Sequence, residues 1–171
     1  EDLAKLMPIE ELQAFRDRAL SPNHPVIRGT AQNPDIYFQT REASNKFYNN
    51  LVPVVEEYIG EINKLTGRNY GLFNYYGADD AEDIIIAMGS VTETIEQTIE
   101  ELNKKGAKYG VVKVHLYRPF STKHLLAAIP STVKRICVLD RTKEPGSAGE
   151  PLYLDVCSAF YGRSEEHTSE L

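Results

Sequence analysis

The sequence has few cysteines and no long apolar run, and each absence excludes a class of protein. Cys137 and Cys157 are its two cysteines, and they do not form a Cys-x-x-Cys pair. Two separated thiols build neither a disulfide scaffold nor a zinc site, and an iron–sulfur cluster needs several closely spaced cysteines. No apolar run approaches the roughly 20 residues that a membrane helix requires. We therefore expect a cytoplasmic protein without a membrane partner, and we expect mid-strand Cys137 to be a small core residue.

Excess positive charge and the familiar ligand motifs are missing as well. The formal net charge is −6, which argues against a nucleic-acid partner. Neither GxGxxG nor GxxxxGK[ST] occurs, and there is no nucleophile elbow. The four histidines are not placed at metal-ligand spacing, and a surface or interface role suits them better: they are His24, His115, His124 and His167. The residues alone therefore indicate no catalytic, cofactor-binding or metal-ligating group.

A continuous apolar run at residues 84–88 organises what is present. Unbroken β-branched runs of this length are typical of strands that are buried on both faces of a parallel sheet. Gly89 and Ser90 follow the run, and an amphipathic helical pattern begins at Val91. Ser90 with Glu93 predicts a capping box at the start of that helix, and Gly106 predicts its end. This is one strand–turn–helix unit of an α/β domain.

The remaining segments complete a three-layer α/β domain with a mostly parallel sheet and helices on both faces, preceded by N-terminal helical segments. The alternating aromatic residues 69–76 predict a strand near a sheet edge, and residues 84–88 and 136–139 predict the inner strands. Residues 111–117 predict a strand with one less protected face. Helices are expected at residues 9–20, 34–66, 91–102, 121–129 and 152–160. Asn33 with Pro34 is a strong helix start, Ser121 is expected to cap its helix, and Pro53 should kink or break the long second one.

Two polar segments are candidate binding or interdomain surfaces. Ligands of open α/β sheets bind beyond the carboxyl ends of the strands, where free helix N–H groups and cations favour an anion. The alternative is that Ser90 and Ser121 only cap the helices that follow them and that the charged side chains pair with a neighbouring domain. The second segment, residues 28–39, is a polar loop that runs onto a helix start. Its composition is typical of an interface, and the alternative is a plain ordered loop. The candidates are Ser90, Arg118, Asp140, Arg141 and Lys143 at the sheet edge, and Arg28, Thr30, Gln32 and Asn33 in the loop.

The last nine residues differ in character from the rest. Residues 163–171 are polar and lack periodicity, so we expect that they do not continue the last helix. They resemble the translated end of a sequencing-library adapter and are set aside as non-native. The other interpretation is a natural disordered tail.

Several long blocks resemble pyruvate:ferredoxin (flavodoxin) oxidoreductase. They run in order along most of the chain: RGTAQNPDIYFQ at residues 28–39, TGRNY at 66–70, LFNYYG at 72–77, LYRPF at 116–120, VLDRTKEPG at 138–146 and GEPLY at 149–153. The resemblance implies a transketolase C-terminal-like domain whose last edge strand is missing. It divides the chain into the tail of a preceding domain and linker (1–32), core domain II (33–162) and the non-native tail (163–171).

The resemblance also implies what the complete enzyme would do. That enzyme, usually a homodimer, decarboxylates pyruvate on thiamine diphosphate with Mg²⁺. It passes electrons through [4Fe-4S] clusters to ferredoxin or flavodoxin and forms acetyl-CoA from coenzyme A. No position of this sequence matches the family's catalytic or cofactor-contacting residues, so none is carried over. The chain is then a structural, interdomain piece that contacts other domains of its own polypeptide.

Two other interpretations stay open at this point. One is a free-standing α/β module that binds a small anion or a phosphate-bearing ligand at the sheet edge. The other is a separate subunit of a related 2-oxoacid:ferredoxin oxidoreductase.

Overall fold

The computed structural model describes residues 2–27, 29 and 31–168, which form two compact units, Glu1–Arg68 and Asn69–Leu171. Arg28 and Thr30, two of the predicted loop candidates, lie outside the described residues.

The first unit consists of helices with exposed surfaces. They are α1 (Asp2–Leu6), α2 (Ile9–Asp17), α3 (Pro34–Ala43) and α4 (Asn45–Thr66), and none of them has a buried residue in the described part of the unit. Pro34 opens α3 as expected, although the Asn33 side chain makes no cap hydrogen bond. The long helical stretch divides at Ser44, and Pro53 lies inside α4, so Pro53 does not break the helix, which was one of the two expected effects. Gly67 ends α4 in the left-handed conformation that glycine adopts without a Cβ penalty.

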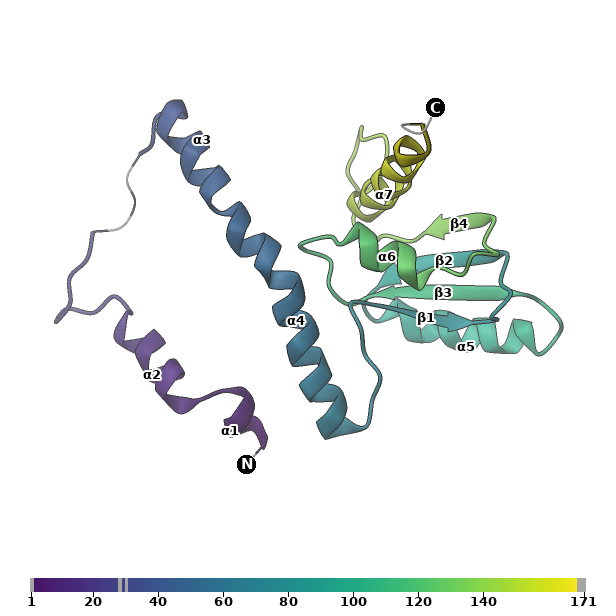
Figure 1. The fold of residues 1–171 in the computed structure, drawn as a ribbon, viewed down its shortest axis with the longest axis horizontal. Helices are drawn as coiled ribbons and strands as arrows, with labels where there is room; N and C mark the ends of the chain where they lie inside the picture. The colour runs from purple at the N-terminus through teal and green to yellow at the C-terminus, as the bar shows by residue number, and fades with distance from the viewer. Residues whose placement is uncertain (1, 28, 30, 169–171) are drawn as a thin grey trace. The chain divides into compact units, whose positions relative to one another are not determined.

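The second unit is an α/β domain with a four-stranded sheet in the order β1-β3-β2-β4 (Figure 1). Strand β1 runs antiparallel to β3, and the other neighbours are parallel, so the predicted mostly parallel α/β sheet is confirmed. The strands are β1 (Phe73–Gly77), β2 (Asp83–Met88), β3 (Tyr109–Val114) and β4 (Arg135–Val138). The helices are α5 (Val91–Asn103), α6 (Thr122–Ala128) and α7 (Pro151–Thr168).

The choice of inner strands was partly wrong. Strand β2 is inner and β1 is an edge strand, as predicted, but the second inner strand is β3 and not β4. Val111 and Val112 in β3 are fully buried, whereas in β4 exposed and half-buried residues alternate and Cys137 is exposed. An apolar sequence is typical of a protected strand, but the connections between the strands decide their order in the sheet. Here β3 lies on one side of β2 and β4 lies on the other.

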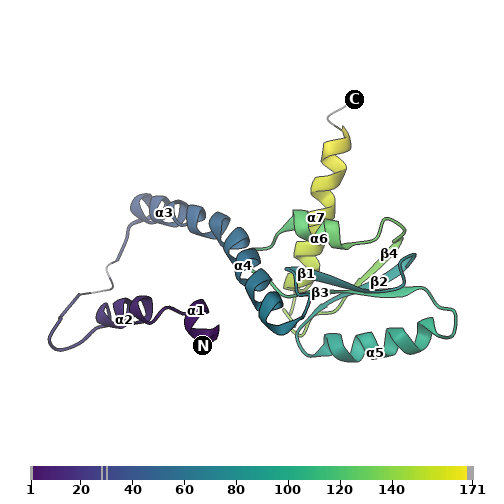
Figure 2. The ribbon, with the colours of Figure 1, turned by 60° about the horizontal axis from the view of Figure 1, so that its bottom comes forward.

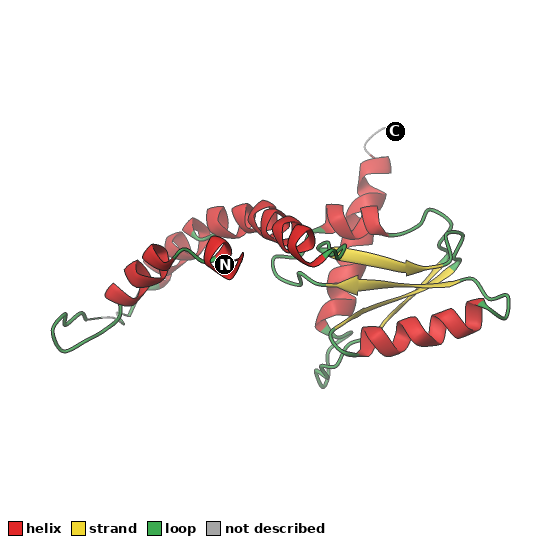
Figure 3. Cartoon of the chain, turned by 90° about the horizontal axis from the view of Figure 1, so that it is seen from below, coloured by secondary structure: helices red, strands yellow, loops and turns green. Residues whose placement is uncertain are grey.

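The helices cover both faces of the sheet. The crossover β2–α5–β3 moves in one direction across the sheet and β3–α6–β4 moves in the other, so right-handed connections place α5 and α6 on opposite faces. Figure 2 shows α5 on one side of the sheet and α6 on the other. Helix α7 packs against α6 and β4. Helix α5 packs against β1, β2 and β3, and Figure 3 shows it running beside the strands of the sheet.

The predicted serine caps are not formed. Ser90 already has helical dihedral angles and makes no cap hydrogen bond, so there is no capping box with Glu93. The Thr92 hydroxyl donates to the Gly89 carbonyl instead, at 2.8 Å. The Ser121 hydroxyl lies 2.6 Å from Nδ1 of His124 and does not cap α6. Helix α7 extends to Thr168, so the expectation that residues after 162 leave the helix was also wrong.

Candidate functional site

The carboxyl ends of the parallel strands carry the predicted edge candidates on three loops. Ser90 follows β2, Arg118 follows β3, and Asp140 follows β4 with Arg141 and Lys143 beyond it. All of these residues belong to the second unit. The contacts of each show whether the edge is free to bind a ligand.

Arg118 is held by an aromatic ring and by a carboxylate of α7. Its guanidinium carbon lies 4.0 Å from the centre of the Tyr117 ring, and Nη2 donates to the Tyr117 hydroxyl at 3.0 Å. Its Nη1 lies 2.7 Å from Oδ2 of Asp155, an ion-pair contact without aligned hydrogen-bond geometry. Burial, and then the Asp155 carboxylate, raises the pKa of Tyr117. Arg118 therefore links the end of β3 to α7, and its charge is balanced within the domain.

Asp140 organises the start of α7 and the loop before it. Oδ2 accepts from the Leu152 N–H at 2.9 Å, in the first turn of α7, and Oδ1 accepts from the Thr142 N–H at 3.0 Å. Burial opposes ionisation, but the backbone donors of Thr142, Leu152 and Arg141 outweigh it and lower the pKa of Asp140. The carboxylate is thus an acceptor for helix N–H groups, and it occupies the helix N-terminus that an anion would need.

Lys143 closes the same loop from its other side. Its Nζ lies 2.8 Å from Oε1 of Glu150, and Oε2 of Glu150 accepts from the Glu144 N–H at 2.7 Å. Lys143, and then the Glu144 N–H, lowers the pKa of Glu150. The loop between β4 and α7 is therefore fixed at both ends by carboxylates.

The other candidates have fewer contacts. Ser90 and Arg141 are exposed at the sheet edge, and Gln32 and Asn33 are exposed before α3 in the first unit. The structure thus brings Arg118, Asp140 and Lys143 into contact with acidic or backbone groups around α7. Among the described side chains it assembles no cluster of unpaired cations there.

The described residues offer no ligand set for a metal or a cluster. No group of three or more His, Cys, Asp or Glu side chains in the described ranges is close enough to hold a metal ion. Cys137 and Cys157 lie on β4 and α7, whereas a [4Fe-4S] cluster takes four thiolates. The described residues thus lack the four neighbouring thiolates that a [4Fe-4S] cluster takes.

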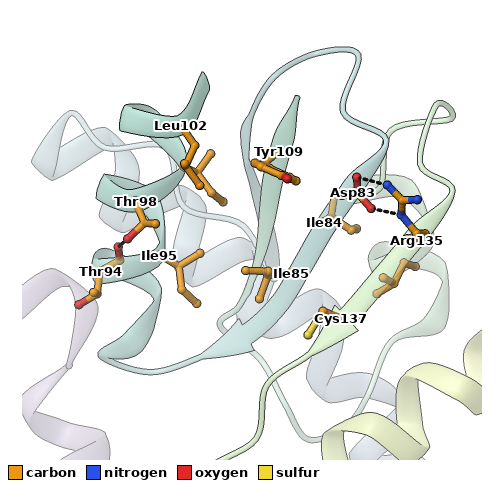
Figure 4. Close-up of a pocket in the computed structure, with 13 residues that line it drawn as sticks. Asp83, Ile84, Ile85, Thr94, Ile95, Thr98, Leu102, Tyr109, Arg135 and Cys137 are labelled. Carbon is orange, nitrogen blue, oxygen red and sulfur yellow. Dashed lines mark hydrogen bonds and ion pairs between the residues drawn. The ribbon is translucent and has the colours of Figure 1, made fainter. Parts of the chain in front are cut away.

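The second unit also has an apolar groove of about 520 Å³ between α5 and β4. Figure 4 shows Ile95, Thr98 and Leu102 of α5 on one side, Ile85 in the floor and Cys137 on the far side. We refer to this hollow, with Asp83 and Arg135 at one end, as the α5–β4 groove. Arg135 pairs with Asp83 through two nitrogens, and Nη2 is 2.7 Å from Oδ2. These two charges therefore satisfy each other.

Sequence reasoning missed Tyr117, Asp155 and Glu150 as partners and missed the groove entirely. Asp155 and Glu150 are ordinary acidic residues in the sequence, and only the packing of α7 brings Asp155 to Arg118. The groove had one signal, because a β4 run that is apolar on both faces implies a cover on each face. The apolar sequence of β4 could not show which of its two faces is covered by a helix of the second unit.

The fold defines the second unit as a domain of the open α/β type with a mostly parallel sheet. In the described residues no helix is long and apolar enough to cross a membrane.

Comparison with known proteins gives the family. Residues 81–170 match the family of pyruvate:ferredoxin oxidoreductase core domain II. The chain belongs to this family, which confirms the resemblance seen in the sequence blocks.

Three similar proteins are named as pyruvate-flavodoxin or pyruvate:ferredoxin oxidoreductases. The chain is 65% identical over 161 residues to a pyruvate-flavodoxin oxidoreductase of Enterobacter agglomerans, covering 94% of this chain and 14% of that protein. It is 60% identical over 161 residues to the Klebsiella pneumoniae pyruvate-flavodoxin oxidoreductase, with the same coverage. It is 57% identical over 156 residues to the pyruvate:ferredoxin oxidoreductase of Moorella thermoacetica, covering 91% of this chain and 13% of that protein. The chain thus spans about one seventh of the length of these relatives.

Proposed function

We propose that this chain is a structural, interdomain part of a pyruvate:ferredoxin (flavodoxin) oxidoreductase. The complete enzyme would convert pyruvate and coenzyme A to acetyl-CoA and CO₂ and pass the electrons to ferredoxin or flavodoxin. The observation that carries the proposal is 65% identity, over nearly the whole chain, to a protein named for that activity. The corresponding relatives are about seven times longer, which favours one long polypeptide over a separate subunit.

The cofactors of the complete enzyme would be held outside the described residues. We assign thiamine diphosphate, Mg²⁺ and [4Fe-4S] clusters to other domains, because the ligand sets that they need are not found among the described side chains. Homodimeric assembly and a cytoplasmic location are part of the same proposal and follow from the family resemblance.

The domain division given above, at residues 1–32, 33–162 and 163–171, also stays a proposal. Within it, the loop with Arg28, Thr30, Gln32 and Asn33 and the sheet edge with Ser90, Arg118, Asp140, Arg141 and Lys143 are interdomain surfaces. The alternative of an anion-binding module has less support, because Arg118 and Lys143 already pair with Asp155 and Glu150.

Expression of the complete reading frame around this segment tests the proposal. The purified protein should reduce a low-potential dye only when both pyruvate and coenzyme A are present. Arg141→Glu in that protein should lower activity through assembly or cofactor retention, which size-exclusion chromatography and thiamine determination measure. A complete protein that retains its cofactors but ignores pyruvate would refute the proposed activity. Saturable binding of coenzyme A to this chain alone, lost in Arg141→Ala, would favour the anion-binding module.

A further inference from the structure

The two faces of the same three strands differ in how well they are covered. On the face opposite α5, Ile86 lies between Val112 and Val138 in the pairing register, and Ile86 and Val112 are fully buried. On the α5 face, Ile85 lies between Val111 and Cys137. Along this second row Val111 is fully buried, Ile85 is half-buried and Cys137 is exposed. Val138, which ends the first row, is half-buried, so burial falls further from β3 to β4 on the α5 face than on the opposite face.

The difference has a geometric cause. Neighbouring strands are about 4.8 Å apart and a helix with its side chains is about 10 Å wide, so one helix covers roughly two strands. In the described second unit, α6 and α7 pack against each other, whereas α5 packs mainly against β3, on the opposite side of the sheet from α6 (Figure 3). The α5 face of β2 and β4 thus has space for one more helix.

Three polar side chains that line the α5–β4 groove, Thr98, Asp83 and Arg135, are already paired. The Thr98 hydroxyl donates to the Thr94 carbonyl at 2.8 Å, and Asp83 pairs with Arg135 (Figure 4). A small-molecule site usually has a few polar groups that converge on the ligand and orient it. Here the available surface is aliphatic, from Ile85, Ile95 and Leu102. This chemistry matches the apolar face of an amphipathic helix and not a polar metabolite.

We propose that the α5–β4 groove is closed by one amphipathic helix from elsewhere in the same complete polypeptide, outside residues 1–171. The proposal rests on the proposed function, because the relatives of this chain contain about six sevenths of their length outside the matched region. A tethered segment has an effective concentration of the order of millimolar, which favours it over a second copy in solution. All the residues that line the groove lie within the matched core domain. The helix would cover Cys137 and the exposed side of Ile85.

Thiol labelling tests the cover directly. Cys137 should react readily with a maleimide in the 171-residue chain and at least about tenfold more slowly in the native complete enzyme. Unfolding the complete enzyme in urea should restore the labelling, as read by mass spectrometry of the Cys137 peptide. Equal reaction rates in the native complete enzyme and in the chain would overturn the proposal.

A pair of tryptophan variants tests the position of the helix. Thr98 lines the groove and its neighbour Gln97 does not, and both are exposed on α5. In the chain alone, Thr98→Trp and Gln97→Trp should have equal melting temperatures. In the complete enzyme, Thr98→Trp should speed Cys137 labelling severalfold, whereas Gln97→Trp should not. Equal effects of the two variants on Cys137 labelling in the complete enzyme would contradict a helix in this groove.

A photo-crosslinking residue at position 98 of the complete enzyme identifies the occupant. The expected product joins position 98 to a peptide of the same protomer beyond residues 1–171. A crosslink to the partner protomer, concentration-dependent dimerisation of the chain that protects Cys137, or a bound small molecule that protects it would each overturn the proposal. These readouts do not depend on turnover. An active enzyme with rapidly labelled Cys137 would refute only the groove assignment, and an inactive one with protected Cys137 would refute only the proposed function.

Discussion

Asp140 shows how one residue can be decisive without being catalytic. Its two oxygens accept from the N–H groups of Leu152 and Thr142 and so connect the end of β4 to the start of α7. The sequence marks Asp140 as a polar residue at a strand end, where a ligand contact and a helix-capping role look the same. The structure favours capping, because both oxygens have backbone partners within the domain.

Replacement of Asp140 should therefore destabilise the second unit in a pH-dependent way. Asp140→Ala removes a cap-like acceptor and should cost about 1 kcal/mol of unfolding free energy at pH 7. The folded-state pKa of Asp140 is lowered, so its stabilisation is present above the unfolded pKa of about 3.9 and is lost as the pH falls through the folded value. Urea unfolding at pH 7 and near pH 3 measures the difference between the wild type and Asp140→Ala.

The matched control for this experiment is Asp79→Ala, which removes an exposed carboxylate in a turn. The gap between the wild type and Asp140→Ala should narrow at low pH, and Asp79→Ala should stay close to the wild type at pH 7. A gap for Asp140→Ala that is equally wide at both pH values would show that its charge does not carry the effect.

Ile85 and Ile86 are adjacent in β2 but face opposite sides of the sheet. Ile86 is fully buried, so Ile86→Ala should cost about 2–5 kcal/mol in the chain, the usual range for a buried isoleucine. Ile85 is half-buried at the floor of the groove, and Ile85→Ala should cost below about 2 kcal/mol because less apolar area leaves water there. Chemical denaturation of the two variants compares them, and equal costs would mean that the groove face is as well covered as the opposite one.

At the scale of elements, the sequence predicted the existence and type of the helices and strands better than their order. The apolar run of β2, the aromatic edge strand β1 and the helix after Gly89 were all recognised from local patterns. Which strand lies beside β2 depends on the connections, and no local pattern of Val111, Val112 or Cys137 specifies it. The candidate site was less predictable still, because the Arg118–Asp155 pair joins elements whose contact depends on packing alone.

Because the second inner strand is β3 and not β4, the expected order of hydrogen-exchange rates among the strands changes. Amides of β2 and β3 have a strand on both sides and should exchange most slowly in the chain, and those of β4 should exchange faster because one of its edges has no partner in the described residues. Exchange measured by mass spectrometry or NMR distinguishes the strands. Slower exchange in β4 than in β3 would contradict the described topology.

At the scale of the whole molecule, exposed apolar surface is the main unexplained feature. The described helices of the first unit have no buried residues, and α4 exposes a stripe formed by Leu51, Val54, Tyr58, Ile62 and Leu65. Contiguous exposed apolar surface of this kind marks an interaction site. Like the α5–β4 groove, this stripe is apolar surface that a neighbouring segment or domain would cover.

The last prediction concerns activity. The chain alone should turn over no pyruvate, even when thiamine diphosphate, Mg²⁺, coenzyme A and an electron acceptor are supplied. This chemistry needs carboxylates for the metal and a chain of redox centres, and the described residues contain no clustered ligands for either. Dye reduction should appear only with the complete protein. Pyruvate-dependent reduction by the purified chain, absent from a matched preparation of empty-vector host, would show that the chain holds a functional centre of its own.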